Sequence, residues 1–286
     1  MDWLLCSVIT GNIRGYQTFK RLLGSNEVTK GEIPFRDMES NAVSRFSKAF
    51  EARFDTTSGQ ERSGWANTTL GRQDTEFADH LLAANARFVI IEFKATLDTI
   101  GTEAGKGLRQ RLFKELAARS DLLKRCLDLH MVCWGTIETH QPEGFPIPIH
   151  EEVEKLNRYA VMVAPFLDVG LKVPATRRMD TQLFLDRFLG ARTFGGTYGR
   201  FRRYLDELGE IAGGTNGDSS TIQGMVCVYL PGNGSTPGRY AHSRFRGLEE
   251  LQLLMNPKNL DKNQWIERSR SRDRNSGPDR SGPSLG

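Results

Sequence analysis

Two carboxylates and a lysine occur close together in an apolar part of the chain. Glu92 and Lys94 follow directly on the apolar run 88–91, and Asp79 lies in the preceding apolar segment. Carboxylate oxygens are the ligands that Mg²⁺ prefers, and an ammonium group stabilises charge that develops on a phosphate. Brought together, these residue types could activate water against a phosphodiester bond.

The expected strands would position these side chains. Residues 88–91 are few and mostly β-branched, which predicts a buried strand that continues to Lys94. Because side chains alternate along a strand, Glu92 and Lys94 should point to one face of the sheet and Phe93 to the other.

A hairpin should carry the second acid to the first. Residues 77–82 also predict a strand, and residues 83–86 can form the turn, since Asn85 tolerates a left-handed backbone. Antiparallel pairing would then place Asp79 across from the strand end that bears Glu92.

This arrangement resembles the PD-(D/E)XK, or restriction-endonuclease-like, nuclease superfamily. Asp79 matches the motif aspartate, and Glu92-Phe93-Lys94 matches the (D/E)-x-K element. Ala78 stands where the family often has a proline. The resemblance covers roughly residues 38–137, and it implies an α/β/α core with a mixed central sheet.

The resemblance also implies a role for each matched residue. Asp79 and Glu92 would bind Mg²⁺ or Mn²⁺, with the backbone carbonyl of Phe93 as a further ligand. Lys94 would orient the attacking water or stabilise charge on the phosphate. The implied activity is hydrolysis of DNA, in a setting such as defence against foreign DNA or a mobile element. The simpler alternative is that Glu92 and Lys94 form an exposed ion pair.

A helix before the first strand could supply a third acid. Residues 38–52 predict this helix, with Val43, Phe46 and Phe50 on its inward face. Glu39 shares that face and is the candidate acid, unless it only complements the helix dipole. The family often has such a residue at this place.

Three acids compete for the role of the motif aspartate. Asp74 and Glu76 precede Asp79 closely. Asp79 fits the length of the hairpin best, and Glu76 is the reserve.

Residues 104–127 predict one long helix with an apolar stripe and a basic polar side. In the resembled family this helix often supplies a Gln, Lys or Arg to the site, and Gln110 and Arg109 are the nearest matches. The basic side could contact DNA phosphates, or it could be an ordinary solvated face. The aromatic and arginine residues of 199–204 are a second basic candidate.

The rest of the chain predicts further α/β structure. We expect strands over 130–137, 159–166 and 221–230, and helices over 151–157, 181–189, 198–208 and 248–255. The expected organisation is a nuclease-like core over 1–137, a C-terminal α/β part over 138–266 on the same core, and a disordered tail over 267–286.

Net charge gives little support to DNA binding. The chain carries 39 basic and 35 acidic residues, a net charge of +4. The tail after Glu267 holds five arginines and two aspartates, so the body is near neutral. Binding to DNA must therefore depend on local patches.

Other signals bound the function. The four cysteines are widely separated, which favours reduced thiols and a cytoplasmic location. We expect no membrane segment, and the absence of a phosphate-binding G-x-x-x-x-G-K-[ST] loop indicates no nucleotide cofactor. A protein partner or a homodimer is plausible for this family. The alternative function is a catalytically inactive, nuclease-fold binding or assembly subunit.

Overall fold

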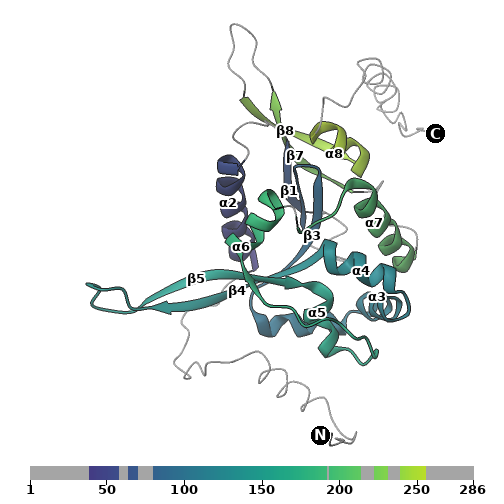
Figure 1. Cartoon of the computed structure of the whole chain (residues 1–286), viewed down its shortest axis with the longest axis horizontal. Helices are drawn as coiled ribbons and strands as arrows, with labels where there is room; N and C mark the ends of the chain where they lie inside the picture. Colours follow the sequence, from purple (N-terminus) through teal and green to yellow (C-terminus); the bar gives the residue numbers. More distant parts are fainter. Residues whose placement is uncertain are drawn as a thin grey trace, which may run out of the picture.

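The computed structural model of the protein describes residues 39–57, 64–69, 80–191, 193–213, 222–230 and 239–255 (Figure 1). These residues form an α/β fold in which helices cover both faces of one sheet. The predictions for Asp74, Glu76, Asp79 and the tail 267–286 lie outside the described residues.

The described sheet has eight strands in the order β6-β5-β4-β3-β2-β1-β7-β8. Only β3 and β4 pair in parallel, so the sheet is mixed, as expected. The strands are β1 (Trp65–Thr69), β2 (His80–Ala84), β3 (Arg87–Lys94), β4 (His130–His140), β5 (Ile149–Arg158), β6 (Met179–Asp180), β7 (Gln223–Leu230) and β8 (Arg239–Arg246).

Alternation along β3 divides the interior into two cores. Phe88 and Ile90 face one core, and Val89, Ile91 and Phe93 face the other. The first core is covered by α3 (Gly107–Ala118), α4 (Ser120–Leu129), α5 (Tyr159–Val163), α7 (Tyr198–Ala212) and α8 (Leu248–Met255). The second is covered by α2 (Glu39–Thr57) and by α6 (Thr181–Leu185) with the π-turn Asp186–Gly190 (Figure 1).

The predicted hairpin and the predicted first helix are confirmed. β2 and β3 pair antiparallel with His80 opposite Ile91. Their turn is shorter than expected, because only Asn85 and Ala86 form it, with φ angles of 50° and 58°. Both residues of a two-residue hairpin turn need a positive φ when the turn follows the twist of the strands.

Helix α2 buries Phe46 and Phe50 at helical spacing, as predicted. Ala42 and Phe54 extend the same stripe, while Val43 lies at its edge. Apolar residues three and four apart therefore place this helix against the sheet.

The single helix predicted over 104–127 is wrong, because the chain forms three segments there. A 3₁₀ segment, η2 (Leu97–Gly105), is followed by α3 and α4, and Arg119 between the two helices has an extended backbone. The apolar stripe shows the reason. Leu112 and Leu116 are four apart, but the next buried leucine is Leu122, so the helical phase is lost.

Two further predictions are wrong in type. Residues 151–157 belong to strand β5, because ten cross-strand pairs with β4 override the local helical preference. Residues 159–166 form α5 and the 3₁₀ turn Ala164–Phe166 instead of a strand. The buried residues Tyr159, Ala160, Met162 and Val163 follow a helical period, which their apolar composition concealed.

The later elements were mostly predicted. The structure has α6, α7, β7 and α8 at the expected places, while β1, β6 and β8 were not predicted. The expected boundary between the nuclease-like core and the C-terminal part, after residue 137, falls inside strand β4. Strands from both sides of this boundary belong to one sheet. Among the described helices there is no apolar segment of the length that a bilayer crossing requires.

Candidate acid–base site

Glu92 and Lys94 lie at the end of the central strand β3 and are both buried. The Lys94 Nζ atom donates a hydrogen bond to Glu92 Oε1 over 2.6 Å. The side chains are only 9% and 1% exposed for Lys94 and Glu92. The alternative of an exposed surface pair is therefore wrong, because both charges have left water and depend on protein partners.

A second carboxylate, Glu103, shares these partners. Its Oε1 atom lies 2.6 Å from Lys106 Nζ and 3.1 Å from Lys94 Nζ. Its Oε2 atom accepts hydrogen bonds from Arg109 Nε over 2.8 Å and from the Tyr159 hydroxyl over 2.9 Å. Glu103 is completely buried, and each of its oxygens has polar neighbours.

Glu103 was not predicted as a site residue, although the sequence carries a weak signal. In a 3₁₀ helix, residues three apart lie on the same side. Ile100 and Glu103 are the buried residues of η2. An acid in line with an apolar inward residue indicates a buried carboxylate with a specific role.

Arg109 completes the arrangement from α3. Its guanidinium is fully buried, with Nη2 3.5 Å from Glu92 Oε2 and the central carbon 5.6 Å from the centre of the Tyr159 ring. The sequence left Arg109 either on a solvated helix side or as a residue that the helix supplies to the site, and the structure places it beside Glu92 and Glu103. We call these side chains the site cluster: Glu92, Lys94, Glu103, Lys106, Arg109 and Tyr159.

The site cluster keeps Glu103 ionised. Burial alone would raise the pKa of this carboxyl, but the charges of Arg109 and Lys94 and the hydrogen bonds from Lys106 and Arg109 hold it well below its usual range. Burial raises the pKa of Tyr159 well above its usual range. Tyr159 therefore stays protonated at neutral pH and donates to Glu103.

A neutral histidine holds Tyr159 from behind. The His130 ring stacks on the Tyr159 ring with centroids 4.0 Å apart. Its Nδ1 atom is 3.0 Å from the Tyr204 hydroxyl. Burial lowers the pKa of His130 well below its usual range, and the Arg109 charge acts in the same direction. Tyr159 thus has a packed and hydrogen-bonded support.

The predicted partner Asp79 lies outside the described residues. The described part of β2 begins at His80, which pairs with Ile91, the residue before Glu92. Phe93 points to the opposite face, where its ring contacts Phe46 at 5.5 Å between centroids. The split of Glu92 and Phe93 between two faces is confirmed, and metal binding by the Phe93 carbonyl stays a prediction.

Two predicted residues are not brought to the site cluster. Glu39 belongs to α2, which packs on the Phe93 face of the sheet, opposite to Glu92. Gln110 is exposed on α3, and its Nε2 atom donates to the carbonyl of Ala104 over 3.2 Å. Successive helix positions differ by about 100°, so the burial of Arg109 turns its neighbour Gln110 away.

Glu92 and Glu103 carry the type of oxygen donor that a divalent cation prefers. Glu92 and Glu103 converge on the ammonium groups of Lys94 and Lys106, so their oxygens already surround a shared positive charge. The Lys106 side chain is 42% exposed and stands at the solvent side. Within the described ranges, no group of three or more His, Cys, Asp or Glu side chains is placed to hold a metal ion.

Comparison with protein-family models, curated proteins and solved structures found no match to this chain. The structure itself defines the chain as an α/β protein with a mixed sheet and a buried acid–base cluster at the end of the central strand.

Proposed function

We propose that the protein is a Mg²⁺-dependent nuclease that hydrolyses phosphodiester bonds in DNA and has a restriction-endonuclease-like core. The observation that carries the proposal is the buried Glu92–Lys94 pair, which shares its ammonium group with a second carboxylate, Glu103. Several charges buried in one place are costly to fold, and such clusters concentrate at functional sites.

The order of the elements supports the same proposal. Helix α2, strand β1, the antiparallel hairpin of β2 and β3, the 3₁₀ segment η2, helices α3 and α4 and the parallel strand β4 follow one another. The expected order was a helix, a hairpin, one helix and a strand, and this order is kept except for the added β1 and η2 and the division of the second helix. The (D/E)-x-K residues end the strand that pairs with β4, in the middle of the sheet.

Five of the six residues of the site cluster then have a task. Glu92 and Glu103, with Asp79 as the predicted further acid, would hold the metal ion through carboxylate oxygens. A bound Mg²⁺ supplies Lewis acidity and lowers the pKa of coordinated water. Lys94 places a positive charge where a phosphate oxygen gains negative charge. Arg109 and Tyr159 fix the Glu103 carboxylate through the contacts described above.

The test is cleavage of plasmid DNA, linear DNA and RNA with and without Mg²⁺. Glu92→Gln and Lys94→Met should each lower Mg²⁺-dependent DNA cleavage by roughly a hundredfold or more. Lys155→Met is the matched control, because Lys155 is also an ion-paired lysine and lies on the neighbouring hairpin. Full activity of both site variants would refute the proposal, and circular dichroism would establish that each variant is folded.

A second candidate is a binding or assembly subunit that keeps the fold without catalysis. It is favoured by the enclosure of Glu92, which is 1% exposed and contacted by Lys94, Lys106 and Arg109, as in a structural ion-pair network. Calorimetric titration with Mn²⁺ separates the two. Binding by the native protein but not by Glu92→Gln supports the nuclease, and no binding with or without DNA supports the subunit.

A further inference from the structure

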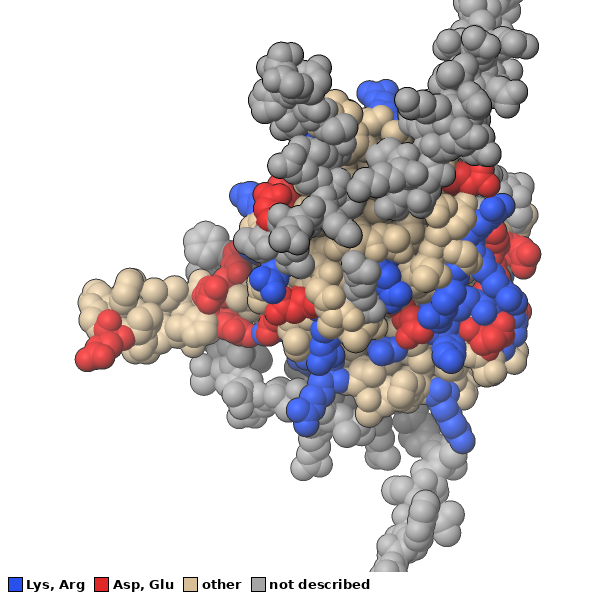
Figure 2. Space-filling view, turned by 45° about the horizontal axis from the view of Figure 1, so that its top comes forward, with Lys and Arg blue, Asp and Glu red and all other residues tan. Residues whose placement is uncertain are grey.

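Two hollows, which we together call the trough, lie along helix α7. Figure 2 shows basic residues, interspersed with acidic ones, gathered on one side of the molecule. One part has a volume of about 460 Å³ and is lined by Asp121, Lys124, Arg125, Gly199, Arg200 and Arg203. A second part of about 500 Å³ shares Gly199 and Arg203 with the first. The two hollows therefore adjoin at these two residues of α7.

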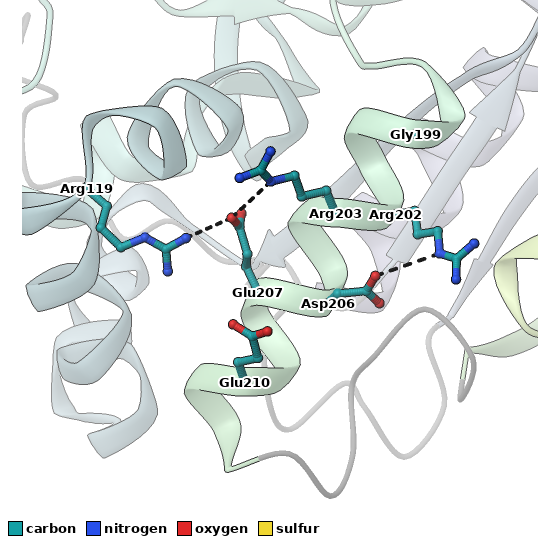
Figure 3. Close-up of a pocket in the computed structure, with 7 residues that line it drawn as sticks. All are labelled: Arg119, Gly199, Arg202, Arg203, Asp206, Glu207 and Glu210. Carbon is teal, nitrogen blue, oxygen red and sulfur yellow. Dashed lines mark hydrogen bonds and ion pairs between the residues drawn. The ribbon is translucent and has the colours of Figure 1, made fainter.

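The first part of the trough is strongly cationic. Its lining has four basic side chains against one acid, Asp121. The second part is balanced, because its lining holds three arginines and three acids. Glu207 lies 2.6 Å from Arg125 Nη2, 2.8 Å from Arg119 Nη2 and 3.5 Å from Arg203 Nε, and Figure 3 draws the last two contacts. Glu207 thus anchors the seam between α4 and α7, and the excess positive charge lies at the end near Arg200.

Lys124, Arg200 and Arg203 are accessible to a ligand, whereas Arg125 is buried and paired with Asp121 and Glu207. The Arg203 side chain is 66% exposed, and its nearest acid contacts, 3.5 and 3.8 Å, are longer than the usual donor–acceptor distance of a hydrogen bond. Arg200 is 44% exposed and pairs with Asp128, which Arg158 also contacts. If a phosphate bound Arg200 and Arg203, their present acid partners would keep other cations: Asp128 would keep Arg158, and Glu207 would keep Arg119 and Arg125.

The lining favours phosphate over other ligands. The cationic part contains charged side chains and a glycine, with no aromatic or aliphatic wall. A nucleobase or a single strand would need stacking surfaces, whereas duplex DNA presents its phosphates outward. No side chain caps the first turn of α7, and Gly199 leaves the approach open, which adds weak attraction for an anion.

We propose that the cationic part of the trough, through the exposed side chains of Lys124, Arg200 and Arg203, binds the phosphate backbone of duplex DNA, independently of sequence. This inference rests on the proposed nuclease function and names the surface that would hold its substrate. Helix α3 connects the site cluster to the trough. Lys106 of the site cluster precedes the first residue of this helix, and Arg119, which lines the second part of the trough, follows its last. Twelve helical residues span about 18 Å, a length over which a duplex carries roughly ten phosphate charges.

The experiment measures DNA affinity in EDTA, where cleavage does not contribute. A fluorescein-labelled duplex is titrated with the full chain, and anisotropy is recorded over a series of salt concentrations. Lys124→Ala/Arg200→Ala should weaken binding roughly tenfold and reduce the slope of log affinity against log salt by about two. Asp121→Asn should strengthen binding, because it removes the acid of the cationic part.

The opposite signs separate an electrostatic role from a structural one. Both variants remove an ion pair, that of Arg200 with Asp128 or that of Asp121 with Arg125, so damage to the fold would weaken binding in both. Lys48→Ala/Arg187→Ala is the matched control, since it removes the same charge from α2 and the π-turn on the other face of the sheet. This control should bind DNA like the native protein.

Defined outcomes would overturn the inference. They are unchanged affinity and salt slope in Lys124→Ala/Arg200→Ala, weaker binding by Asp121→Asn, or tighter binding of single-stranded DNA or RNA of equal length. Native protein that binds duplex in EDTA but does not cleave it with Mg²⁺ would refute the nuclease and leave the trough standing. If the native protein cleaves DNA and Lys124→Ala/Arg200→Ala binds DNA as well as the native protein does, the trough is refuted and the nuclease proposal stands.

Discussion

Arg109 Nε donates a hydrogen bond to Glu103 Oε2 over 2.8 Å, and both side chains are completely buried. The pair joins helix α3 to the 3₁₀ segment before it, and Glu103 also accepts from Tyr159 of α5. One ion pair therefore ties three covering elements to the end of β3. Such a pair is costly to desolvate and strongly coupled once it is formed.

Removal of Arg109 should destabilise the protein strongly. Arg109→Met is expected to lower the free energy of unfolding by about 3–5 kcal/mol, because it takes a cation from two buried carboxylates. The double variant Arg109→Met/Glu103→Leu should lose less than the sum of the single variants, with a coupling above about 1 kcal/mol. Urea unfolding measures all three. Arg203→Met, at an exposed ion pair, should cost less than about 1 kcal/mol, and additive losses would contradict the coupling.

His130 should make stability depend on pH. Its pKa is lowered in the folded protein, so below the unfolded value of 6.5 the unfolded chain takes up a proton that the folded chain does not. Stability therefore falls as the pH falls below that value, by about 1.4 kcal/mol per pH unit for one histidine. His130→Phe should reduce the slope of unfolding free energy against pH between about pH 6 and 5 by this amount.

Tyr204→Phe is the control for this prediction. It removes the hydrogen bond between Tyr204 and His130 Nδ1 but keeps the titrating ring. It should lower stability and leave the pH slope unchanged. An unchanged slope in His130→Phe would show that His130 does not account for the effect.

The β2–β3 turn contains a strained alanine that can be relieved. Ala86 has a φ of 58°, a left-handed conformation that costs a non-glycine residue about 1 kcal/mol. Ala86→Gly should raise the free energy of unfolding by about 0.5–1 kcal/mol, because glycine suits the second position of this turn. Ala84→Gly, in the adjacent buried strand, should lower it by a similar amount. Destabilisation by Ala86→Gly, measured by urea unfolding, would contradict the turn geometry.

Gly195 is required where the chain returns to the start of β3. Its φ is 74°, and a Cβ atom there would lie 2.9 Å from the Phe88 carbonyl oxygen and 2.9 Å from the Phe188 ring. Gly195→Ala should therefore cost about 2–4 kcal/mol, as thermal unfolding would show. Gly107→Ala, at an open helix position, should be neutral or stabilising by up to about 1 kcal/mol. Equal effects of the two would be inconsistent with the close contact at Gly195.

Local sequence determined those elements in which a short stretch of residues already shows the repeat of buried side chains. The apolar run before Glu92 and Lys94 fixes β3 and the face of each side chain, since alternation needs no other information. The spacing of Phe46 and Phe50 likewise identified α2. Neither pattern says which element lies opposite, so Glu39 was predicted on the wrong side of the sheet.

Tertiary structure decided what depends on distant partners. Glu103 gains its place from Tyr159, 56 positions later, and no local period reveals that contact. Residues 151–157 became a strand because β4 offers a full ladder of backbone partners. Residue types and spacing thus defined the chemistry of Glu92 and Lys94, while the buried partners of these charges arise only when the helices pack on the sheet.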